Sequence, residues 1–91
     1  MNYVFFGGKE SEFAQIILDK LIAAGYPPLA AIRDAHLPID IAYLQSLKVD
    51  FFLVVAFGKI LKQEVLDIPQ KGVVGVHPSL LPKYRGASPI Q

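Results

Sequence analysis

The chain has 91 residues, a formal net charge of +1, and neither cysteine nor tryptophan. This length allows one domain at most, and the lack of cysteine excludes disulfides, zinc–thiolate sites and thiol catalysis. Hydrophobic residues make up 53% of the chain and charged residues 19%, which excludes intrinsic disorder, and the nearly balanced charge gives no strong attraction to nucleic acid or membranes. The longest apolar run, Phe51 to Phe57, is far shorter than the roughly 20 residues of a membrane-spanning helix. No basic region precedes the first apolar stretch, as it would in a signal peptide, so we expect a soluble, cytoplasmic protein.

The first half of the chain predicts two strands and two helices. Residues 3–6 are β-formers closed by two glycines, which is typical of a buried strand. Over residues 11–24, apolar side chains recur every three or four positions and Gly25 ends the pattern, which predicts a helix. A second short buried strand is expected at 29–32, and a short amphipathic helix is expected after Pro38.

The second half predicts two further strands and a short helix between them. Residues 51–56 give the clearest strand signal, residues 60–66 allow a turn or two of helix ended by Pro69, and residues 73–76 predict a last strand. From His77 onward, closely spaced prolines and glycines disfavour regular structure. Apolar strands that alternate with helices are typical of an α/β fold, an open parallel sheet of about four strands with helices packed on it.

In an open parallel sheet, ligands bind outside the carboxyl ends of the strands. Four places in the sequence follow predicted strands, and any site should be assembled from them: Gly7-Gly8, Arg33-Asp34, Phe57-Gly58 and His77-Pro78.

Two of these places allow more than one interpretation. Gly7-Gly8-Lys9 matches neither the dinucleotide fingerprint nor the P-loop, so it is either a tight turn that lets the backbone pass close to a neighbour or a backbone contact to a ligand. Arg33, Asp34 and His36 lie together in a loop, where such groups are ordinarily solvated.

The stretch from His77 onward puts an imidazole at the mouth of a buried strand. Pro78 and Pro82 stiffen the loop that follows, and Leu80 and Leu81 are apolar where a solvated loop would be polar. Such a loop either covers a core or lines a pocket. On these grounds alone, His77 is either a structural histidine or a catalytic acid or base.

The same stretch resembles the signature of the folate-dependent formyltransferases, in the run His77-Pro78-Ser79-Leu80-Leu81-Pro82 followed by residues 84–91. Within that family it is most similar to the enzymes that formylate methionyl-tRNA. Weaker similarities lie at residues 4–7, 12–14, 54–61 and 64–69. The resemblance implies a Rossmann-like sheet, in a single formyltransferase-like N-terminal domain over residues 1–91 that is truncated.

The resemblance implies transfer of a formyl group from 10-formyltetrahydrofolate to an amine. The family uses an Asn-x-His pair on one strand and an Asp further along. Here His77 matches the histidine, Gly75 stands where the asparagine would be, and the Asp position would lie beyond Gln91. The asparagine would stabilise the oxyanion of the tetrahedral intermediate, and the Asp would orient the imidazole.

Further site residues are implied only by the resemblance, which requires no metal. The segment that flanks the pterin and the transferred group is Ser79-Leu80-Leu81-Pro82. The neighbouring loop near that pocket contains Lys59, Ile60 and Leu61.

Two hypotheses for the function follow. The first is a reduced formyltransferase domain that is weak or inactive as a 91-residue chain. Initiator methionyl-tRNA is the family's acceptor, but the loop that engages its acceptor end and the second, tRNA-contacting domain have no counterpart in the 91 residues. The alternative is a non-catalytic α/β relic that binds folate or associates with proteins, with a homodimer expected because an open sheet edge is a template for pairing, and with C-terminal segments that exchange between the copies.

Overall fold

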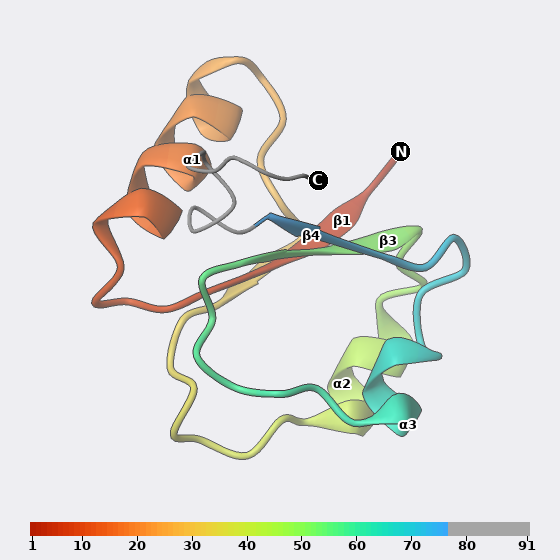
Figure 1. Cartoon of the computed structure of the whole chain (residues 1–91). Helices are drawn as coiled ribbons and strands as arrows, with labels where there is room; N and C mark the ends of the chain where they lie inside the picture. Colours follow the sequence, from red (N-terminus) through yellow and green to blue (C-terminus); the bar gives the residue numbers. More distant parts are fainter. Residues whose placement is uncertain (77–91) are drawn as a thin grey trace, which may run out of the picture.

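The computed structural model describes residues 1–76, which fold into one sheet and three helices (Figure 1). In chain order the elements are β1 (Tyr3–Gly7), α1 (Glu12–Ala23), β2 (Ala30–Ile32), α2 (Ile41–Ser46), β3 (Phe51–Val55), α3 (Gln63–Leu66) and β4 (Val73–Val76). Each predicted element is present, with bounds that differ from the sequence-based ones by at most three residues. The irregular structure expected from His77 onward lies outside the described residues.

The four strands form one parallel sheet in the order β2-β1-β3-β4. Helix α1 covers one face of this sheet, and α2 and α3 cover the other (Figure 1). The predicted α/β class, parallel sheet and strand number are therefore confirmed. The register pairs Gly7 with Val55, and Val55 with Val76, so the last residues of three strands lie side by side.

The core has two halves, one on each face of the sheet, because successive residues of a strand point to opposite faces. On the α1 face, Tyr3, Phe5 and Val55 pack with Ala14 and Leu18 of the helix. The core of the opposite face is built from residues of β1, β3, α2, α3 and the loops after α2 and β3, namely Val4, Phe6, Leu44, Val49, Phe52, Phe57 and Val65. Strand β1 lies in the middle of the sheet, and its apolar side chains contribute to both halves.

Helix α1 begins and ends where its sequence indicates. The Ser11 side chain accepts a hydrogen bond from the Ala14 N–H at 3.1 Å, which satisfies one of the free donors of the first turn. At the other end Gly25 has a φ of +91°, and the N–H of Tyr26 donates to the carbonyl of Leu21. This is a Schellman arrangement, in which glycine takes the left-handed conformation at the lowest cost.

The strand at 29–32 was expected to be buried, and this expectation is wrong. Strand β2 is only half-buried, and Ala31 is exposed. The reason is its place in the sheet, because β2 pairs with β1 on one side and is an edge strand. Sequence pattern alone does not reveal which of several short apolar strands lies at an edge.

We predict that Gly7→Ala lowers the free energy of unfolding by about 2 kcal/mol, because an added methyl group overpacks a filled core. Its Cβ atom would approach the Phe5 ring and would lie 3.0 Å from the Cβ atom of Ala14, and the Phe5 side chain is fully buried in the core. Urea denaturation measures the loss.

Gly25→Ala is the comparison variant for this test. A Cβ atom at Gly25 meets nothing within 4 Å, so only the left-handed backbone conformation opposes the change. We expect a loss of about 1 kcal/mol there. A Gly7→Ala variant as stable as the wild type would contradict the tight packing at the end of β1.

Candidate functional site

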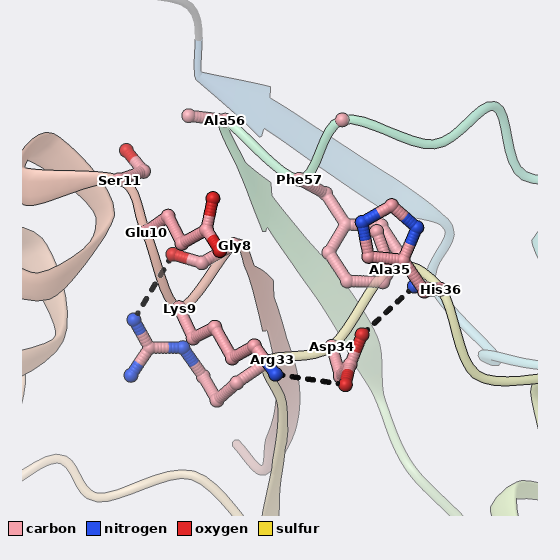
Figure 2. Close-up of a pocket in the computed structure, with 11 residues that line it drawn as sticks. Gly8, Lys9, Glu10, Ser11, Arg33, Asp34, Ala35, His36, Ala56 and Phe57 are labelled. Atoms are coloured by element: carbon pink, nitrogen blue, oxygen red, sulfur yellow. Dashed lines mark hydrogen bonds and ion pairs between the residues drawn. The ribbon is translucent and has the colours of Figure 1, made fainter.

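A cleft of about 320 Å³ opens at the carboxyl edge of the sheet, where β1, β2 and β3 end (Figure 2). It is lined by three short segments, Gly8–Ser11, Arg33–His36 and Ala56–Gly58. The cleft lies at three of the four strand ends from which a site is predicted to be assembled. The fourth, His77-Pro78, lies outside the described residues.

The turn after β1 runs close to the turn after β3. The Gly8 N–H donates to the Ala56 carbonyl at 3.1 Å, and a Cβ atom at Gly8 would lie 3.1 Å from that same oxygen. Ala56 has a φ of +49°, a conformation that costs a non-glycine residue on the order of 1 kcal/mol. The close approach of the backbone to a neighbour, one of the two interpretations of Gly7-Gly8, is present, and a backbone contact to a ligand stays a prediction.

Arg33 connects the end of β2 to the turn after β1. Its Nε donates to the Gly7 carbonyl at 2.6 Å and its Nη2 to the Gly8 carbonyl at 3.3 Å. Its Nη1 donates to Oε1 of Gln15 on α1 at 3.0 Å, and the guanidinium carbon lies 5.7 Å from the centre of the Phe5 ring. A single side chain thus links β2, the turn after β1 and helix α1.

Lys9 and Asp34 face each other across the cleft (Figure 2), with Nζ and Oδ2 2.9 Å apart. The other carboxylate oxygen of Asp34 accepts from the His36 backbone N–H at 2.9 Å. The hydrogen bond from Lys9 and then that from His36 hold the pKa of the Asp34 carboxyl below its ordinary value. The same pair raises the pKa of Lys9.

For Arg33 and Asp34, the interpretation of the 33–36 loop as ordinary solvated polar residues leaves out the contacts that these side chains make, although the Lys9–Asp34 pair is exposed to solvent. Arg33 and Asp34 are each half-buried and hydrogen-bonded to the turn after β1, whereas His36 is exposed. The sequence signal that could have found this contact is topological, because β2 and β1 pair in parallel and their following loops must meet.

The residues implied by the resemblance lie partly beside the cleft. The Lys59 Nζ donates to the Leu37 carbonyl at 3.1 Å, Ile60 is 92% exposed, and Leu61 packs against the core on the face of α2 and α3. Gly75 is an exposed residue of β4 opposite Val54. The remaining predicted site residues lie outside the described residues: His77, Ser79, Leu80, Leu81 and Pro82.

The described part of the chain holds no group of three or more histidine, aspartate or glutamate side chains placed to bind a metal ion. Over the same residues, no helix has the length and apolar character that crossing a bilayer requires.

A family model described as "Formyl transferase" matches residues 30–91, more than half of the chain. The chain belongs to the formyl transferase family. This confirms the resemblance stated from the sequence, and the matched region includes two of the three segments that line the cleft.

Several curated relatives are named methionyl-tRNA formyltransferase. The one from Clostridium tetani is 58% identical over 59 residues, which is 65% of this chain and 18% of the relative. Those from Agathobacter rectalis and Thermosynechococcus vestitus are 56% and 54% identical over 57% and 65% of this chain, and over 17% of each relative. The matched part thus spans less than a fifth of the length of each of these relatives.

We predict that the Lys9–Asp34 pair contributes a stability that depends on pH. Because the folded-state pKa of Asp34 is lowered, the pair stabilises the folded chain above the ordinary carboxyl pKa. This contribution is lost as the pH falls through the lowered folded-state value. The wild type should therefore exceed Asp34→Asn in urea midpoint at neutral pH, and the difference should vanish in strong acid.

Lys9→Met provides the control for this measurement. When the ammonium is absent, Asp34→Asn should have a smaller effect at neutral pH, because the two side chains interact with each other. An equal effect of Asp34→Asn with and without Lys9 would show that the ion pair contributes nothing.

Proposed function

We propose that the chain takes part in formyl transfer from 10-formyltetrahydrofolate to the amine of methionyl-tRNA, as a single formyltransferase-like domain. The family match carries this proposal, together with the printed names of the relatives. The cleft supports it, since it opens at the edge of the sheet toward which β4, the strand that precedes His77, also runs. A reaction on methionyl-tRNA also makes the cytoplasm the proposed location.

The proposed step is an acyl transfer without oxidation or reduction. The acceptor nitrogen forms a bond to the formyl carbon, and the bond from that carbon to N10 of the folate breaks. The proton lost by the amine ends on N10 of the tetrahydrofolate that leaves. We assign the carriage of this proton to His77, because an imidazole accepts and releases protons near neutral pH.

Gly75, which stands at the family's asparagine position, lowers the rate of formyl transfer that we expect. The family's asparagine would donate a hydrogen bond to the oxyanion that forms on the formyl oxygen, and glycine has no side chain to do so. Loss of one such donor costs on the order of 10²–10³ in rate. We therefore propose that transfer by this chain is slow and that its weakest point is the stabilisation of the intermediate.

The formyl donor is assigned to the loops that follow β3 and β4. Ile60 presents an apolar side chain that is 92% exposed, as a residue that contacts a flat pterin ring would in the unbound chain. The Lys59 bond to the Leu37 carbonyl holds this loop against the loop before α2. Leu61 anchors the loop in the core, and Ser79, Leu80, Leu81 and Pro82 complete the proposed folate wall.

We predict that Gly75→Asn accelerates formylation of methionyl-tRNA by about tenfold or more, and that His77→Asn abolishes it, because an oxyanion donor is gained and the proton carrier is lost. Radiolabelled formyl transfer measures both effects. Gly25→Asn is the matched control, because it makes the same exchange at the end of α1, where asparagine is tolerated.

A folate analogue that cannot release its formyl group tests binding separately from chemistry. Binding to the folded chain raises its melting temperature by mass action. A chain that neither gains stability with millimolar analogue nor transfers formyl groups would refute the proposed function.

A second candidate function is association through strand β4. Val73 and Val74 are 37% and 50% exposed, and no described strand pairs with β4 on the side away from β3. The strand carries neither charge nor proline, the features that usually prevent edge-to-edge pairing. The exchange of C-terminal segments in such a dimer concerns residues outside the described ones and stays a prediction.

We predict that Val74→Lys shifts the chain toward the monomer in sedimentation equilibrium, because a lysine on an edge strand opposes pairing. Ala31→Lys makes a similar change on the edge strand β2 and should leave the association unchanged. A wild-type chain that is monomeric at high concentration would remove this candidate.

A further inference from the structure

The Arg33 side chain differs from the other charged groups of the cleft in its partners. Within the part of the chain that the structure describes, its side chain donates three hydrogen bonds, all to neutral oxygens, those of Gly7, Gly8 and Gln15. Over residues 1–76, the only ion pair is the one between Lys9 and Asp34. Among the described residues, the guanidinium therefore acts as a multiple hydrogen-bond donor to the turn and to helix α1, and it forms no salt bridge there.

The turn that Arg33 holds is also fixed by backbone hydrogen bonds from the Gly8 N–H to the Ala56 carbonyl and from the Ser11 N–H to the Gly8 carbonyl. Gly7 and Gly8 carry no side chains that could pack, and glycine has the greatest backbone freedom of any residue. The Lys9 N–H returns a hydrogen bond to the Arg33 carbonyl at 2.8 Å, so that the two segments are bonded in both directions. Arg33 and this turn together form two adjoining walls of the cleft.

Lysine would not replace this group. The planar guanidinium presents donors in a fixed fork, and here Nε and Nη2 reach two successive carbonyls while Nη1 reaches helix α1. A lysine ammonium is a single point on a flexible stem, and it would reach one of these oxygens at a time. The three hydrogen bonds of Arg33 thus depend on the planar shape of its guanidinium as well as on its charge.

We propose that Arg33 is a positioning residue, whose guanidinium holds the turn between β1 and α1 in the shape that receives the formyl acceptor. The inference rests on the proposed function. It assigns the acceptor to this turn because the residues assigned to the donor lie on other loops, after β3 and β4. Acceptor binding then depends on Arg33, whereas donor binding does not.

Two variants separate shape from charge, and both are made in the full chain. Arg33→Met keeps an apolar stem beside the Phe5 ring and loses the three side-chain hydrogen bonds, and Arg33→Lys keeps the charge. We expect each to raise the KM for methionyl-tRNA about tenfold, with the KM for 10-formyltetrahydrofolate nearly unchanged. Lys20→Met removes a positive charge from the exposed side of α1 and should change neither constant.

A restored acceptor KM in Arg33→Lys would overturn the proposal, and so would an equal rise for donor and acceptor. Amide hydrogen exchange tests whether the Arg33 side chain holds the turn after β1, and it needs no enzymatic activity. In Arg33→Met, the N–H groups of Lys9 and Ser11 should exchange about tenfold faster, while those of β3 stay protected. Unchanged exchange, or faster exchange throughout the chain, would also overturn it.

The activity and binding assays test the proposed function, and amide hydrogen exchange tests the role of Arg33 separately. A wild-type chain that transfers no formyl group and binds no folate analogue would end the proposed function. Locally faster amide exchange in Arg33→Met would then still support the role of Arg33 in holding the turn between β1 and α1.

Discussion

The pairing of β1 with β3 is the constraint on which the rest of the structure depends. Three successive side chains of β1, those of Val4, Phe5 and Phe6, are fully buried. Complete burial of a large apolar side chain contributes about 1.5–3 kcal/mol each, a large share for a domain of this size. The pairing that buries them also fixes the register, and the register brings Gly7 beside Val55. The cleft exists because these two strands end together.

The two faces of the sheet contribute to the cleft in different ways. The Gly8–Ser11 segment, which joins β1 to helix α1, forms one wall. The loops that lead to α2 and α3 form the others, and Phe57 is buried in the core of that second face. Packing on both faces therefore determines the width of the cleft, although each half of the core is built from different residues.

The order and type of the elements could be predicted because each strand is a short apolar run and α1 has clear end signals. Ser11 caps the helix and Gly25 ends it, and both act through local geometry that sequence reveals. The position of the cleft at the strand ends followed from the parallel topology. The same topology indicates that the loops after β1 and β2 meet, but the individual contacts of Arg33 and Asp34 join residues about 25 positions apart and depend on the register of the two strands, which the sequence pattern does not reveal.

The same register explains why a charged side chain is needed at the end of β2. Gly7 has no room for a side chain, since its Cβ position is occupied by the Phe5 ring and by Ala14. Glycine is therefore required at the end of β1, and it contributes no side chain to the turn that follows. The Arg33 guanidinium adds side-chain hydrogen bonds to the Gly7 and Gly8 carbonyls from outside that turn. The core and the Arg33 bonds are linked in this way, because packing requires a residue without a side chain where Arg33 then bonds the backbone.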